Sequence, residues 1–172
     1  MPTRHLPAAL HRAQPWKNGL GVSYTIADFP EGAGFDSVQW QVGHTAITAD
    51  CPFSDLPGMD RQFMVLEGAG VELTCTDATG KASVRRIEPL QPPFAFQGDW
   101  RTTCRLLDGP VKVFNVMTRR GKFSAVVSLE PSAIENADDK LIAVALPGLD
   151  AWIVEGERPP AVRGLLVRIR RQ

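Results

Sequence analysis

The run Pro15-Trp16-Lys17-Asn18-Gly19-Leu20-Gly21 combines one aromatic ring, one cation, one side-chain amide and two glycines. Proline fixes the backbone φ angle and glycine permits positive values, so this run can hold a tight turn. The turn would offer an apolar wall, a cationic donor and a mixed donor and acceptor to a small anion or polar ligand. A surface loop whose Trp16 fills a gap at the edge of the core is the alternative.

Two further stretches place polar side chains beside turns. Residues 51–61 contain two prolines and a Pro57-Gly58 turn, and they lead into a strand pattern that starts near Arg61. A guanidinium at that point can bind a carboxylate through two parallel N–H bonds, whereas a surface ion pair with an aspartate is the alternative. Asn115 lies among apolar neighbours after the turn at Gly109-Pro110. A buried amide there needs partners from the protein or from a ligand.

The three histidines, His5, His11 and His44, form no metal-binding motif. No HxH pair is present, and no Cys-x-x-Cys pair accompanies them. We therefore expect no metal and no cofactor. His44 follows a strand pattern, so it either lines a pocket or makes a hydrogen bond at the end of a strand. Signatures of a serine nucleophile, of a phosphate-binding loop and of a dinucleotide-binding loop are also missing from the sequence.

These residues must be positioned by strands. The sequence contains short runs that alternate between apolar and polar side chains or are rich in β-branched residues. Fourteen prolines and fifteen glycines separate the runs. This spacing predicts an all-β sandwich or barrel with few helices rather than βαβ units. One short helix is expected over residues 131–140. The expected strands are Val22–Ala27, Ser37–Val42, Phe63–Leu66, Val71–Thr76, Ala82–Ile87, Val111–Met117, Ala125–Leu129, Leu141–Ala145, Ala151–Glu155 and Ala161–Ile169.

Composition excludes several partners. The chain of 172 residues is 44% hydrophobic and 22% charged, as in ordinary globular proteins. Nineteen basic residues balance nineteen acidic ones, so no net field favours nucleic acid or an anionic membrane. Three separated cysteines, no apolar leader and no long apolar run indicate a reduced, cytoplasmic protein without a membrane span.

Four stretches, in this order, resemble the HutD/Ves family of small bacterial proteins. They are PWKNGLG (15–21), CPFSDLPGMDR (51–61), PFAFQGD (93–99) and LLDGPVKVFNVMTRRG (106–121). The resemblance implies two packed cupin-like β-barrels, a bicupin without the cupin metal ligands. Residues 1–120 would form the first barrel unit, and residues 121–172 a smaller unit that exchanges strands with it.

The resemblance also implies a function and a site. It implies a pocket for a small carboxylate, formylglutamate or formate, in a protein that governs histidine catabolism without catalysing a step. Trp16, Lys17, Asn18, Arg61 and Asn115 match the family's motif residues by position. Together with His44 they are the expected ligand-binding residues.

At three positions the chain departs from the family pattern. Leu20 stands where the family usually has a glycine, Gln41 where it often has arginine, and Val113 where it often has aspartate. The loss of one arginine and one aspartate changes the expected charge of the pocket. The identity of the ligand therefore stays open.

Two other function classes stay open as well. A metal-free isomerase or lyase would use Lys17 or His44 as general acid and base and Arg61 to hold a carboxylic acid. An interaction module would dock a protein partner along an exposed strand edge, with Trp16 facing solvent and no deep pocket. Whether the chain forms a homodimer is also left open.

Overall fold

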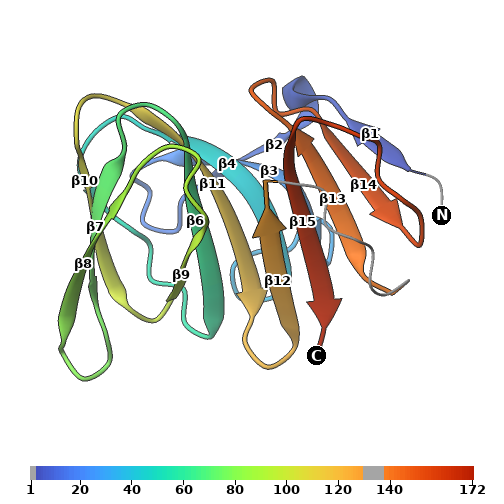
Figure 1. Cartoon of the computed structure of the whole chain (residues 1–172). Helices are drawn as coiled ribbons and strands as arrows, with labels where there is room; N and C mark the ends of the chain where they lie inside the picture. The colour runs from blue at the N-terminus through green and yellow to red at the C-terminus, as the bar shows by residue number, and fades with distance from the viewer. Residues whose placement is uncertain (1–2, 130–137) are drawn as a thin grey trace.

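The computed structural model of the chain describes residues 3–129 and 138–172 (Figure 1). Within these residues every named strand pair is antiparallel, and a single 3₁₀ turn, η1 (Ala8–Leu10), is the one helical element. The all-β prediction is confirmed. Most of the expected helix over 131–140 lies outside the described residues, and Lys140 begins a strand.

The strands form three sheets. The central sheet has the order β2 (Arg12–Pro15), β3 (Val22–Phe29), β4 (Trp40–Ile47), β11 (Val111–Arg119), β6 (Met59–Glu67) and β9 (Phe94–Gln97). A second sheet has the order β1 (Arg4–Leu6), β14 (Ala151–Glu155), β13 (Lys140–Ala145), β15 (Gly164–Arg171) and β12 (Phe123–Ser128). The third has the order β5 (Cys51–Pro52), β10 (Arg101–Leu106), β7 (Val71–Thr76) and β8 (Ala82–Ile87).

The central sheet is apolar on both faces, and each face is covered by one of the other sheets (Figure 1). Side chains alternate between the faces of a strand, so Val113 and Phe114 of β11 point in opposite directions. Phe114 packs with Ile142 and Val167 of the second sheet. Val113 packs with Leu73 of the third sheet. The result is a three-layered molecule with one large apolar core on each side of the central sheet and two smaller buried clusters.

The strand orders describe open sheets in the part of the chain that the structure covers. Two closed barrels therefore stay a prediction, as does the division of the chain near residue 120. Strand β1 from the N-terminus pairs with β14 near the C-terminus, with Arg4 opposite Ile153. The N-terminal segment thus contributes to the sheet that the last fifty residues build.

Cross-strand register brings the candidate site residues together. Gln41 of β4 lies opposite Met117 of β11, and Met117 lies opposite Arg61 of β6. In the next row of the same face, Thr25 of β3 is opposite Gly43, and Gly43 is opposite Asn115. Residues from four parts of the sequence therefore share one face of the central sheet.

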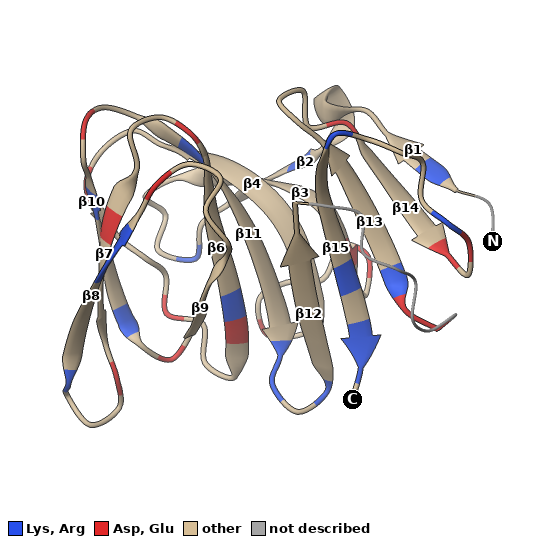
Figure 2. Ribbon diagram, in the orientation of Figure 1, with Lys and Arg blue, Asp and Glu red and all other residues tan. Residues whose placement is uncertain are grey.

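Charged side chains of both signs are interspersed on strands and loops of all three sheets (Figure 2). Many of them form ion pairs between neighbouring strands, such as Lys112 with Glu67 and Arg105 with Glu72. Among the described residues, no helix has the length and apolar character needed to cross a membrane.

Candidate functional site

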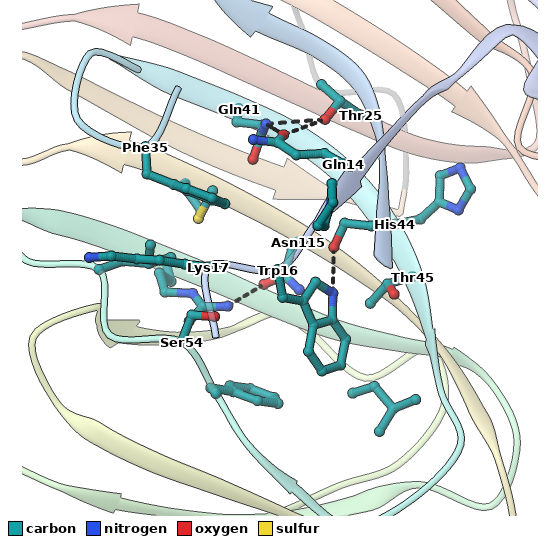
Figure 3. Close-up of a pocket in the computed structure, with 18 residues that line it drawn as sticks. Gln14, Trp16, Lys17, Thr25, Phe35, Gln41, His44, Thr45, Ser54 and Asn115 are labelled. Atoms are coloured by element: carbon teal, nitrogen blue, oxygen red, sulfur yellow. Dashed lines mark hydrogen bonds between the residues drawn. The ribbon is translucent and has the colours of Figure 1, made fainter. Parts of the chain in front are cut away.

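A cavity of about 80 Å³ opens on the face of the central sheet that carries Arg61 and Asn115 (Figure 3). A single water needs roughly 10–15 Å³ of such space, so the cavity is large enough for a small ligand. No Asp or Glu is among the described residues that line it. The lining residues used below are Gln14, Trp16, Lys17, Thr25, Gln41, Gly43, His44, Phe53, Ser54, Arg61, Asn115 and Met117.

The turn at residues 16–21 forms one wall of the cavity. It connects β2 to β3, with the Trp16 amide donating to the Gly21 carbonyl at 2.8 Å and the Gly19 amide to the Trp16 carbonyl at 2.9 Å. The indole of Trp16 lies so close to Gly21 that a Cβ there would meet ring atoms at 2.7 Å. Trp16 also donates from Nε1 to Ser23 Oγ at 2.9 Å. Glycine at 21 is therefore what allows Trp16 to fold back over its own hairpin.

Asn18 links this turn by hydrogen bonds to β5 and the loop that follows it. Its Nδ2 donates to the Pro52 carbonyl at 3.1 Å, and its backbone amide donates to Ser54 Oγ at 3.2 Å. Its Oδ1 accepts from the Leu20 amide at 3.1 Å. Asn18 is exposed and is not among the residues that line the cavity. Its role in the structure is to hold two loops of the site together.

Replacing Asn18 with alanine removes both of its side-chain hydrogen bonds. We expect Asn18→Ala to lower the free energy of unfolding by about 1 kcal/mol, since the bonds are exposed, and to loosen residues 52–55. Urea unfolding and the rate of proteolytic cleavage in this loop measure the two effects. Leu20→Ala, which trims an exposed neighbour, is the control. Equal cleavage rates in both variants would show that Asn18 does not hold the loop.

Lys17 lies at the rim of the cavity. Its Nζ donates to the Asp55 carbonyl at 3.1 Å, and the side chain is exposed. In Figure 3 its chain extends away from Asn115. Lys17 therefore supplies a solvated positive charge at the entrance rather than a buried contact.

Arg61 is the buried cation of the site. Its guanidinium packs against two neighbouring aromatic rings, with Cζ 5.3 Å from the centre of Phe53 and 5.0 Å from the centre of Phe96. Nη2 donates to Asn115 Oδ1 at 3.5 Å, which is long for a hydrogen bond. Nε is buried and has no partner, and none of the described carboxylates pairs with Arg61. With one long hydrogen bond and no paired carboxylate among the described residues, the buried charge of Arg61 is only partly compensated.

Burial lowers the pKa of Arg61 to about 10, because removal from water disfavours the charged form. The guanidinium is still protonated at neutral pH. It therefore offers a positive charge and an unused donor in a site with little water, where an anion binds more strongly than it would in solution.

At the other end of the cavity, three neutral side chains form a cluster that we call the amide cluster: Gln14, Thr25 and Gln41 (Figure 3). Gln41 Nε2 donates to Gln14 Oε1 at 2.7 Å and to Thr25 Oγ1 at 3.1 Å. Thr25 Oγ1 donates to Gln14 Oε1 at 3.2 Å. The bonds fix both amide planes at the position where β2, β3 and β4 lie side by side.

His44 borders the cavity, but its imidazole points away from Trp16 and Asn115 (Figure 3). Its Nε2 lies 2.8 Å from His11 Nδ1, and its ring stacks on Tyr24 with 5.5 Å between centres. Strand alternation explains this, because Gly43 and Thr45 face the cavity and His44 stands between them. The pair with His11 ties β4 to the N-terminal segment.

The histidine pair makes stability depend on pH. Burial, the neighbouring His11 and Lys112 lower the pKa of His44 to about 4, and burial also lowers the pKa of His11. Between about pH 6.5 and pH 4 the unfolded chain binds more protons than the folded one, so stability falls as pH falls through this range. We expect His44→Asn to flatten this slope in urea unfolding measured at pH 7 and at pH 5. A slope unchanged from the parent protein would contradict this; His5→Asn, at an exposed position, is the control.

Of the six site residues expected from the sequence, Trp16, Lys17, Arg61, Asn115 and His44 border one cavity, and Asn18 braces it. The sequence reasoning did not identify Gln14 and Thr25, and it noted Gln41 only as a departure from the family pattern. One weak signal for Gln41 is present in the sequence. It stands two residues before Gly43, so both residues lie on the same face of the strand. Across the described residues, no three His, Cys, Asp or Glu side chains gather in a way that could hold a metal ion.

The family description HutD matches residues 8–149. Protein Ves from Escherichia fergusonii is 31% identical over 115 residues, which are 66% of this chain and 56% of that protein. An uncharacterised 21.2 kDa protein in the hutC 3′ region of Pseudomonas putida is 33% identical over 113 residues, 64% of this chain and 55% of that protein. The matched part of the chain thus spans about half the length of these relatives.

Two solved structures resemble the whole chain. HutD from Pseudomonas fluorescens SBW25, determined in a formate condition, has a TM-score of 0.81 and 27% identity over 99% of this chain and 100% of that one. A conserved protein of unknown function from Pseudomonas aeruginosa PAO1 has a TM-score of 0.78 and 25% identity over 100% of both chains. The similarity extends to the second sheet, beyond the stretches that carry the sequence resemblance.

Proposed function

This chain belongs to the HutD family, and we propose that it binds a small carboxylate and regulates histidine or amino-acid catabolism. The observation that carries the proposal is Arg61, a buried guanidinium that none of the described carboxylates pairs with, in a cavity that no described acidic residue lines. Formate and formylglutamate are the candidate ligands that the family resemblance suggests. A cupin-like double-barrel fold without a metal and a cytoplasmic location belong to the same proposal.

The cavity provides a complementary set of groups for a carboxylate. Arg61 Nε has no partner, and the Asn115 Nδ2 has none among the described residues. A carboxylate that contacts Asn115 Nδ2 and the guanidinium would accept hydrogen bonds from both side chains and neutralise the charge of Arg61. The Phe53 and Phe96 rings exclude water from the opposite side of the guanidinium, and Trp16 walls the entrance.

The regulatory part of the proposal rests on the family and on gene context. One relative is described as a protein in the hutC 3′ region. A protein that senses an acid from amino-acid breakdown needs a selective pocket and no catalytic group, and this cavity fits that description. The enzyme alternative lacks a supporting observation, because Lys17 is solvated and the imidazole of His44 is bonded to His11.

Calorimetric titration with formate, formylglutamate, urocanate and glutamate tests the binding. We expect at least one of these acids to bind and to raise the melting temperature. If no small acid binds or stabilises the protein, the proposed function is wrong. The interaction-module alternative would then gain support, and capture of a protein partner would be the next experiment.

A further inference from the structure

The amide cluster bears on which carboxylate fits. The Gln14 carbonyl accepts a hydrogen bond from the Gln41 NH₂ group. The Thr25 hydroxyl is hydrogen-bonded to both of these groups. One NH₂ group, on Gln14, and one carbonyl group, on Gln41, have no partner among the described residues. Interchanging the oxygen and nitrogen of both amides leaves the same pair of unused groups, one donor and one acceptor.

A carboxamide is the ligand group that matches this pair. Its carbonyl accepts from the unused NH₂ group, and its own N–H donates to the unused carbonyl. A carboxylate has only acceptors, so it would leave the unused carbonyl opposite a negative oxygen. Hydrogen-bonding groups that a bound ligand shields from water and leaves unpaired cost affinity, and an unpaired charge costs more.

The charged residues near the amide cluster also favour a neutral carboxamide over a carboxylate at this end. Among the described lining residues, the lysine and arginine side chains are those of Lys17 and Arg61. Neither contacts the amide cluster. Arg12 leaves the same strand as Gln14, but its guanidinium is paired with the Asp28 carboxylate and it does not line the cavity. A second carboxylate at this end would therefore be buried without a cation.

The distance between the two ends suits a short ligand. Gln41 and Arg61 are separated by one strand, so their Cα atoms lie two strand spacings apart, about 10 Å. The amide of Gln41 reaches toward Gln14 and Thr25, and the guanidinium of Arg61 reaches toward Asn115, so the two groups stay at opposite ends of the cavity. A four-carbon chain with a polar group at each end, with a hydrogen bond of about 3 Å added on each side, spans a separation of this order.

We propose that the ligand of this cavity is a monoanion with its carboxylate at Arg61 and Asn115 and a neutral carboxamide at Gln14, Thr25 and Gln41. This inference rests on the proposed carboxylate-binding function and narrows it, because it disfavours the dicarboxylic acids among the candidates, formylglutamate and glutamate. Gln41 becomes the residue that sets specificity between an amide acid and a dicarboxylic acid.

Three ligands of the same size and shape test the inference by calorimetry with the full chain. Succinamate carries the carboxamide, succinate a second carboxylate, and 4-methylpentanoate two methyl groups at the same place. We expect succinamate to bind at least about tenfold more tightly than either of the others, which corresponds to about one net hydrogen bond. Gln41→Met should reduce this preference over 4-methylpentanoate to about twofold or less. Gln97→Met, at an exposed position of β9 away from the cavity, should leave the preference intact.

The outcomes separate the two proposals. Succinate binding as tightly as succinamate would overturn the monoanion inference and leave carboxylate binding in place. Failure of all three ligands and of the acids named above would instead overturn the proposed function. Should Gln41→Met not fold, Gln14→Met on the edge strand β2 removes the unused NH₂ group and must reduce the same preference.

Discussion

Arg61→Met is expected to abolish carboxylate binding and to stabilise the protein without ligand. Methionine fills much of the same volume beside Phe53 and Phe96 but carries no charge. Loss of a buried charged partner typically costs about 2–5 kcal/mol of binding, so the affinity for a small acid should fall at least about thirtyfold. Calorimetric titration with the ligand that binds the parent protein measures this loss.

The gain in stability has an electrostatic cause. Burial lowers the pKa of Arg61 to about 10 from an ordinary value of 12.5, so at neutral pH the folded state holds a cation at a cost on the order of 3 kcal/mol. The unfolded chain binds more protons between these two pKa values. Stability therefore rises with pH only above about pH 10, and the full cost is present at pH 7.

Methionine removes this cost but also the attraction between the guanidinium and the two rings. We expect a net rise of about 1–2 kcal/mol, or a melting temperature several degrees higher for a chain of this size. Arg101→Met, at an exposed position of β10, is the matched control and should change neither property. Undiminished binding by Arg61→Met would remove the central support for a carboxylate site.

Gly43→Ala is expected to lower both stability and ligand affinity. A Cβ at residue 43 would lie 2.7 Å from the Tyr24 carbonyl oxygen, and this atom belongs to the backbone of the neighbouring strand. The pairing of β3 with β4 is irregular between Thr25 and Ala27, which brings Tyr24 this close. To relieve the clash, β3 must move away and carry Thr25 with it.

The expected cost is that of overpacking a tight interior, about 1–3 kcal/mol of unfolding free energy. Thermal unfolding and calorimetric titration measure the two effects in the same preparation. Gly34→Ala is the matched control, because no atom lies within 4 Å of its added Cβ and alanine restricts the unfolded chain. If Gly43→Ala melts and binds like the control, the position of β3 does not define the site.

Strands with an alternating or β-branched pattern could be predicted from the sequence, and those with neither could not. Val71–Thr76, Ala82–Ile87 and Ala151–Glu155 agree with the structure to the residue. The strand expected at Ser37–Val42 is shifted, since β4 runs from Trp40 to Ile47 through Gly43 and His44. Glycine weakens a strand pattern locally, and here the close backbone of β3 requires it.

Five strands were not predicted; β2 forms a local hairpin with β3, and the other four depend on contacts distant in sequence. β10 alternates buried Thr102 and Cys104 with exposed arginines, which is a weak apolar signal. It forms because β7 and β5 pair with its two edges. β1 is three residues long and exists through pairing with β14, almost 150 residues away. Local propensity carries no information about such partners.

By itself the sequence determined the all-β class, the family, and a set of side chains able to bind an anion, because turn residues, strand periodicity and side-chain chemistry are local properties. Tertiary structure decided which of these side chains act together. Register placed Arg61 beside Asn115 and turned the imidazole of His44 to the opposite face of its strand. Packing buried Arg61 with no partner among the described carboxylates, and strand pairing assembled the amide cluster from three strands. Charge compensation and unused hydrogen-bonding groups depend on which chain segments pack together, and so only the folded molecule defines them.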